Sequence, residues 1–349
     1  MPFCQSAYIF TNYKKQVIKT VKKILSILLT LSILTGIFIL FTGLSSDGKK
    51  DFIRYAEFNV CYEALEKALD YDISSNRNNE KIKINWIEVL AALGAKYGGD
   101  FGKYKENDMT EVVERLKNGE KIEEICQQKR YYNYYKEVYS AVLGGFTGWY
   151  TEEYENENGK TENNKNYGLC VFSPVAKTFP FSHYDDFGAD RSYGYKRPHL
   201  GHDLMAATGT PVVAIETGTV EIMGWNQYGG WRIGIRSMDR KRYYYYAHLR
   251  QNRPFHPYIK EGKVVNAGDV IGYVGRTGYS TTENTNNIEI SHLHLGMELV
   301  FDESQKESDN EIWINLYAIT KLLEKHKSTV YRLDETKEFY SRYRFRKID

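Results

Sequence analysis

The sequence has few cysteines and almost no net charge, and each shortage argues against a class of protein. Its 349 residues include four cysteines without any CxxC spacing, namely Cys4, Cys61, Cys126 and Cys170. They are too few for a fold built on disulfides, and we expect buried apolar residues rather than metal ligands. Lys and Arg total 47 against 45 Asp and Glu, a formal net charge of +2. Nucleic acid is therefore not an expected partner.

One long hydrophobic run stands near the start of the chain. Ile24–Leu44 has 21 residues and no charge. As a helix it would span about 30 Å, the thickness of a bilayer's hydrocarbon core. It is longer than a signal-peptide core, and no small-residue cleavage site follows, which favours a retained transmembrane anchor over 24–44. The lysines before it predict that 1–23 is a cytoplasmic basic tail and that the chain after about Ser45 lies outside.

Two regions of different pattern follow the anchor. Over 51–150 apolar residues recur at spacings of three and four, which predicts a small all-α domain. The segment 151–168 is polar and aperiodic, so we expect a linker and a domain boundary there. From 169 to 330 short alternating strands broken by glycines predict an antiparallel all-β domain, closed by a helix over 311–326. A charged tail, 331–349, completes a predicted α+β chain.

The stretch "SHLHLGMEL", Ser291–Leu299, alternates polar and apolar side chains. In a strand, Leu293 and Leu295 would face the core while His292 and His294 share the other face. An HxH of this kind is also compatible with an ordinary solvated sheet face. Other histidine-bearing strings must therefore decide its meaning.

Two such strings lie upstream. "RPHLGHD" places His199 four residues before Asp203, and "YYAHL" ends a predicted strand on His248. Imidazole and carboxylate suit zinc, and a catalytic zinc usually takes three protein ligands and keeps one open position. Taken alone, the HxxxD is also typical of a turn histidine beside a capping aspartate. Three such strings in one β-domain together indicate a metal site.

These strings also carry a resemblance. "HLGHDLMAATGTPVVAIETGTVEIMGW", "YYYYAHL", "VVNAGDVIGYVGRTGYST" and "HLHLGMEL" resemble, in order, the motifs of the lysostaphin-type (LytM-type) zinc metalloendopeptidases, over about a third of the chain. The resemblance implies the duplicated hybrid-motif β fold of that family. It also implies one zinc ion held by His199, Asp203 and His294.

Further site residues follow from the same resemblance. His248 and His292 would line the reaction centre without binding metal and act as catalytic groups, and Tyr193 could contact substrate. His202, one residue before Asp203, is an alternative ligand. The histidines outside every motif are expected to be ordinary surface residues: His183, His256 and His326.

The implied activity is hydrolysis of cross-bridges or stem peptides of bacterial peptidoglycan by an enzyme anchored in the cell membrane and facing the wall. The alternative is a non-catalytic scaffold or activator of the same fold in an envelope or sporulation complex; the complete histidine set favours the enzyme. A third possibility, a second active site at Glu88 of the helical region, rests on the use of carboxylates by glycosidases. Two features depart from the family. The helical region has no assignable motif, so its protein partner stays open, and the predicted loop Tyr279–Ser291 is unusually long.

Overall fold

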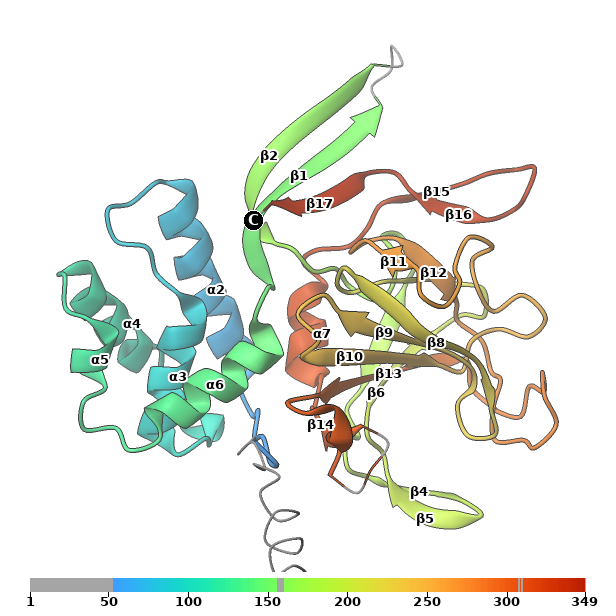
Figure 1. The fold of residues 1–349 in the computed structure, drawn as a ribbon, viewed down its shortest axis with the longest axis horizontal. Coiled ribbons are helices and arrows are strands. Elements are labelled where there is room, and N and C mark those ends of the chain that lie inside the picture. The colour runs from blue at the N-terminus through green and yellow to red at the C-terminus, as the bar shows by residue number, and fades with distance from the viewer. Residues whose placement is uncertain (1–52, 156–159, 307, 309, 349) are drawn as a thin grey trace, which may run out of the picture. The chain divides into compact units, whose positions relative to one another are not determined.

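Helices occupy the first part of the described chain and strands most of the rest (Figure 1). The computed structural model describes residues 53–155, 160–306, 308 and 310–348. Within these residues no helix has the length and apolarity needed to cross a membrane. The predicted basic tail, 1–23, and anchor, 24–44, lie outside the described residues.

The predicted helical region is confirmed. Its helices are α2 (Tyr62–Arg77), α3 (Trp86–Tyr97), α4 (Glu106–Lys117), α5 (Ile122–Ile125) and α6 (Tyr132–Leu143), with a 3-10 turn, η1, at Phe101–Lys103. Helix α3 shows why the pattern was informative: Asn85 caps its start by accepting from the backbone N–H of Ile87 at 3.0 Å, and Gly98 ends it in the left-handed conformation. Glu88 forms an ion pair with Lys136 of α6, 2.7 Å apart, which gives it a structural role.

The predicted antiparallel β architecture is also confirmed. The main sheet has the order β11-β8-β9-β10-β13-β6-β3, and β14 also pairs with β13. Its strands are β3 (Phe181–Tyr184), β6 (His202–Ala206), β8 (Gly218–Asn226), β9 (Gly230–Ser237), β10 (Arg242–Ala247), β11 (Val264–Val265), β13 (His292–Leu299) and β14 (Ile312–Trp313). Two pairs stand apart: β7 (Pro211–Val213) with β12 (Val270–Tyr273), and β4 (Asp190–Tyr193) with β5 (Tyr195–Pro198). The closing helix α7 is only Tyr317–Leu323, since the preceding residues form β14.

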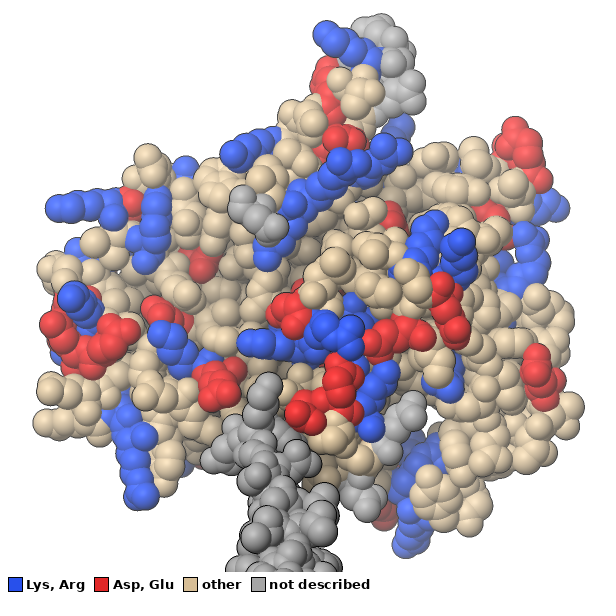
Figure 2. All heavy atoms as spheres, viewed as in Figure 1, with Lys and Arg blue, Asp and Glu red and all other residues tan. Residues whose placement is uncertain are grey.

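The predicted linker and charged tail are corrected by the structure. Residues 151–155 belong to β1 (Thr147–Glu155) and residues 161–168 to β2 (Thr161–Leu169), and the two strands pair in antiparallel register. The tail contains β16 (Phe339–Ser341) and β17 (Arg344–Ile348), and the latter pairs with β1; β15 (Val330–Arg332) overlaps the tail's start. Residues 161–166 are exposed, so β2 has no alternating apolar pattern. Each of its residues nevertheless pairs with a residue of β1. Lys and Arg side chains gather over this sheet (Figure 2).

The helices pack on the β part through one continuous apolar core. Arg242, only 1% exposed, donates from Nη1 to the carbonyl oxygen of Ala141 in α6 at 2.7 Å. Tyr167 of β2 donates its hydroxyl to Asp72 of α2, also at 2.7 Å. The extents of the two predicted domains, 51–150 and 169–330, stay predictions.

Candidate active site

Two neighbouring strands bring the predicted ligands together. Strand pairing sets His294 of β13 opposite Asp203 of β6, and His199 lies just before β6. His199 Nε2 is 3.1 Å from Asp203 Oδ1 and 2.8 Å from His294 Nδ1, and the last two atoms are 3.0 Å apart. The alternation seen in the sequence is confirmed, because Leu293 and Leu295 are fully buried on the opposite face.

The triangle of ligand atoms fits zinc. Tetrahedral bonds of about 2.0–2.2 Å place ligand atoms about 3.4 Å apart, only a few tenths of an ångström more than the distances found. The donor set of two imidazoles and a carboxylate is one that zinc uses. We conclude that His199, Asp203 and His294 form a zinc-binding triad.

The charges and hydrogen bonds around the triad favour the binding of a cation. Burial alone would raise the pKa of the Asp203 carboxyl, but hydrogen bonds from His199 and His294 and the charges of His294 and His292 outweigh it, so its pKa lies well below its usual range. Burial lowers the pKa of His294, although the hydrogen bond and charge of Asp203 oppose the shift, and a lower pKa favours the neutral ring that binds metal.

Asp186 supports the first ligand and was missed in the sequence. Its carboxylate Oδ1 lies 2.9 Å from Nδ1 of His199, an ion-pair contact outside hydrogen-bond geometry, and its backbone carbonyl oxygen lies 3.4 Å from the same nitrogen. Its other carboxylate oxygen pairs with Arg191. A carboxylate on the outer nitrogen of a ligating histidine fixes the ring and its tautomer. No motif marks Asp186, since it stands in a loop between β3 and β4 and reaches the site only through the fold.

Gly201 explains the glycine inside the HLGHD string. A Cβ built on it would lie 2.4 Å from Cε1 and 2.6 Å from Nε2 of His294, far inside van der Waals contact. A side chain at this position would therefore push the His294 ring out of the triad.

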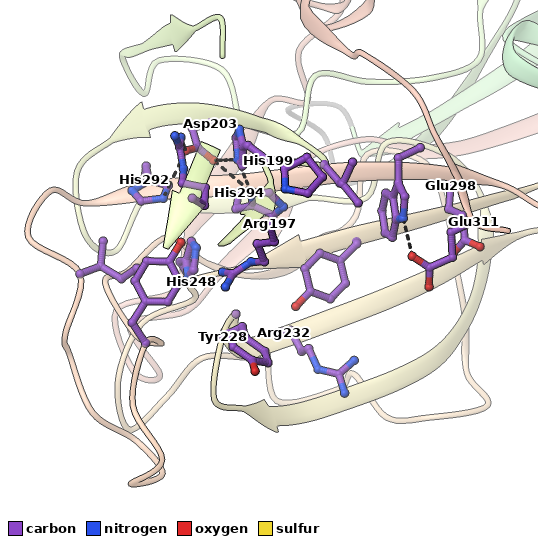
Figure 3. Close-up of a pocket in the computed structure, with 18 of the residues that line it drawn as sticks. Arg197, His199, Asp203, Tyr228, Arg232, His248, His292, His294, Glu298 and Glu311 are labelled. Carbon is purple, nitrogen blue, oxygen red and sulfur yellow. Dashed lines mark hydrogen bonds and ion pairs between the residues drawn. The ribbon is translucent and has the colours of Figure 1, made fainter. Parts of the chain in front are cut away.

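His248 and His292 lie beside the triad, as predicted, and are absent from the ligand set (Figure 3). Their ring centroids are 4.9 Å apart. Nδ1 of His248 is 2.9 Å from the carbonyl oxygen of Thr277, and Nδ1 of His292 is 2.8 Å from that of Ile290. Because a carbonyl oxygen can only accept, each Nδ1 carries a proton, so Nε2 is the atom of each ring that can exchange a proton. Burial holds the pKa of His248 well below its usual value.

The alternative ligand His202 lies on the other face of β6. Its Nε2 is 2.8 Å from Nδ1 of His183, whose own Nε2 is 2.8 Å from Glu324. Burial, with a further contribution from His183, lowers the pKa of His202 to about 3. His202 is thus part of a separate hydrogen-bonded chain.

The three histidines expected on the surface require correction. His183 is largely covered because it stacks on His202, with ring centroids 5.1 Å apart. His256 is 1% exposed, and His326 stacks on Phe172 at 4.0 Å. Histidine has an apolar ring, and without a clear strand pattern around these positions the sequence did not show that the rings are buried.

The triad opens into a cleft of about 480 Å³. The long loop predicted over Tyr279–Ser291 has no strand, and Tyr279 and the segment 287–289 line the cleft. Tyr193 does not line it; its ring stacks on Tyr279, with centroids 5.4 Å apart. Any contact of Tyr193 with substrate stays a proposal.

Known proteins share both the motif set and the fold. Residues 197–307 match the model of peptidase family M23. This segment belongs to that family. A stretch of 124 residues, 36% of the chain, is 42% identical to an L-Ala–D-Glu endopeptidase of Bacillus subtilis. A second match, 40% identical over 98 residues or 28% of the chain, is a glycyl-glycine endopeptidase of Staphylococcus capitis.

These matches cover only parts of the proteins compared. The chain spans 36% of the Bacillus protein and 24% of the Staphylococcus protein. A crystal structure of a lytM protein from Ruminococcus gnavus is similar in fold beyond the M23 segment, with a TM-score of 0.50 and 23% identity. That similarity covers 79% of this chain and 92% of the other.

Proposed function

We propose that this chain is a zinc metalloendopeptidase that cleaves peptides of bacterial peptidoglycan. The observation that carries the proposal is the complete M23 triad with two further histidines at its edge, all lining one cleft. The names of the two curated relatives, which specify peptide bonds, support this substrate class. The proposed active form contains one zinc per chain.

The roles of the two unligated histidines follow from their hydrogen bonds. When bound, zinc supplies Lewis-acid chemistry, because it activates water as a nucleophile and polarises a carbonyl. Nδ1 of each ring is committed to a backbone carbonyl, and Nε2 of His292 lies 3.8 Å from Asp203 Oδ2. We assign the Nε2 atoms of His248 and His292 to accept the proton of the attacking water and return it to the leaving amine. In their protonated forms they donate to the oxyanion that develops at the scissile carbonyl.

We further propose that the chain is anchored in the cell membrane by 24–44, with the M23 segment on the wall side. The uncharged run and the lysines before it support this topology. Protease added to intact protoplasts should then degrade the chain beyond Ser45. Complete protection of that region would exclude the topology.

Digestion of purified cell walls by residues 50–349 tests the activity. We expect soluble peptides with new amino termini, identified by mass spectrometry, and none from the His294→Ala variant. If the wild-type chain contains stoichiometric zinc and releases no peptide from any wall type, the chain is a scaffold or activator rather than an enzyme.

A further inference from the structure

Four Lys and Arg side chains line the cleft together with the carboxylates of Glu289, Glu298 and Glu311, and two of the four are paired with carboxylates. Arg191 pairs with Asp186, and Lys306 pairs with Glu221. The other two, Arg197 of β5 and Arg232 of β9, lie along the same cleft. These two are the ones whose charge is still available to a ligand.

Arg197 and Arg232 lack anionic partners. Within the part of the chain that the structure describes, no carboxylate oxygen lies within 4.0 Å of either guanidinium. Nη1 of Arg197 and Nε of Arg232 are buried nitrogens without any hydrogen-bond acceptor. A buried donor without an acceptor is costly, and arginine's planar fork matches a carboxylate in geometry. Both side chains therefore favour an anionic group on whatever occupies the cleft.

Tyrosine rings hold the two guanidinium groups in place. Arg197 lies 4.7 Å from the ring centroid of Tyr228 and 5.4 Å from that of Tyr279. Arg232 lies 6.0 Å from the ring centroid of Tyr245, which is itself 5.9 Å from the ring of His294. Contacts of a cation with an aromatic face at these distances are attractive. Arg197 lies beside the triad, and Arg232 lies farther along the same cleft (Figure 3).

We propose that Arg197 and Arg232 bind a free carboxylate of the substrate beside the scissile bond, and so select a glutamate-bearing stem peptide over an uncharged glycine bridge. The inference rests on the proposed function. Glutamate has two carboxyl groups, so a glutamyl residue linked through one of them keeps the other free unless it is amidated. A glycine bridge offers only peptide groups along its length. Arg197 and Arg232 therefore distinguish the two substrate classes.

Paired peptides test the inference without turnover. The probes are Ala–γ-D-Glu–Lys with a free α-carboxylate and the same peptide with that group as its amide. Affinities for the full chain, freed of zinc by chelation, are measured by calorimetry. We expect the free carboxylate to bind about 10- to 100-fold more tightly, the range that a hydrogen bond to a charged group contributes.

Three variants separate recognition from a structural role. Arg197→Gln and Arg232→Gln should each reduce the preference for the carboxylate about tenfold or more, while leaving the affinity for the amide unchanged. Arg332→Gln, which removes the same charge from an exposed position on β15, should keep the full preference. Equal affinity of the wild-type chain for the two peptides would overturn the inference, as would equal losses for both peptides in the cleft variants.

The proposed function and the anion site fail in distinguishable ways. A chain that prefers the carboxylate and cleaves no wall peptide would remove the activity and keep the anion site. A chain that cleaves wall peptides without distinguishing carboxylate from amide would keep the activity and remove the anion site.

Discussion

Each metal ligand is held by a different physical cause. His294 is placed by strand pairing and by the absence of a side chain at Gly201. His199 is oriented by Asp186, and Asp203 is kept ionised by the imidazoles around it. Loss of one ligand removes one of the three metal-binding side chains, whereas loss of a residue that orients a ligand only weakens metal binding.

Replacement of His294 should abolish tight zinc binding. His294→Ala leaves two ligands, which lowers both affinity and geometric selection. Metal analysis after dialysis should show about one zinc in the wild-type chain and almost none in the variant. His202→Gln is the matched control, because His202 lies on the other face of β6 and should keep its zinc. Zinc loss only in His202→Gln would reassign the ligand.

His248→Ala and His292→Ala should keep zinc and lose activity. A positioned acid or base typically contributes about 10²- to 10⁴-fold to the rate, so kcat should fall by that factor in each variant. Peptide hydrolysis is measured beside zinc content for the same samples. Wild-type turnover in both variants would remove these histidines from the mechanism.

Asp186→Asn should weaken zinc binding without abolishing it. Removal of a carboxylate that orients a ligating histidine typically costs about 10- to 100-fold in metal affinity. Competition with a fluorescent chelator measures the change. The control is Asp185→Asn, which alters an adjacent and exposed carboxylate. Identical zinc affinities in the two variants would show that Asp186 is not a supporting residue.

At the scale of elements, alternation predicted strands only where one face is buried. The HxH strand could be recognised because its leucines face the core. The polar hairpin β1–β2 could not, since a strand exposed over most of its length has no apolar period and is defined by its pairing partners. Asp186 escaped prediction for the same reason: its contact with His199 is tertiary and has no local signal.

Among the hydrogen bonds that hold the long loop at the cleft, those of the Asn284 side chain connect it to two neighbouring segments. Asn284 Oδ1 accepts from Nε1 of Trp231 at 2.9 Å and from the backbone N–H of Asn252 at 2.8 Å. Asn284 Nδ2 also donates to Oδ1 of Asn252 at 2.7 Å. Asn284→Ala removes all three bonds, so the loop should become more mobile. We expect KM for a wall peptide to rise by about 3- to 30-fold, since one or two hydrogen bonds contribute about 1–2 kcal/mol, with zinc content unchanged.

An exposed position in the same loop gives the comparison. Thr282 lies two residues earlier and is exposed, and its hydrogen bonds with Ser280 involve only its backbone, so Thr282→Ala should leave KM close to the wild-type value. An unchanged KM in Asn284→Ala as well would show that order in the loop has no part in substrate binding.

At the scale of the whole molecule, buried polar contacts join the helical region to the sheet. Arg242 is held by two oxygens of Glu216, at 2.9 and 3.0 Å, and reaches the carbonyl of Ala141 in α6. The sequence predicted both halves, since each has its own periodicity. The sequence could not predict that the helical region packs on the sheet, because a buried arginine and an exposed one look alike in a sequence. The same limit applies to the buried histidines.

The stability of the folded chain should therefore fall in mild acid. Burial lowers the pKa of His256, although the charge of Glu338 partly opposes the shift. The unfolded chain, with a histidine pKa of about 6.5, binds this proton more readily than the native state. The stabilisation is thus fully present above about pH 6.5 and is lost as the pH falls toward the lowered native pKa.

The His256→Phe variant isolates this contribution. Its ring occupies a similar volume between Tyr258 and Tyr340 and cannot be protonated. Urea unfolding at pH 7.5 and 5.5 should show a smaller loss of unfolding free energy in the variant than in the wild-type chain. One histidine can account for at most about 1.4 kcal/mol per pH unit. All other titrating groups, the triad included, are common to both proteins, so the difference between the two losses belongs to His256. Equal losses would mean that His256 is accommodated in its charged form and that acid sensitivity arises elsewhere in the fold.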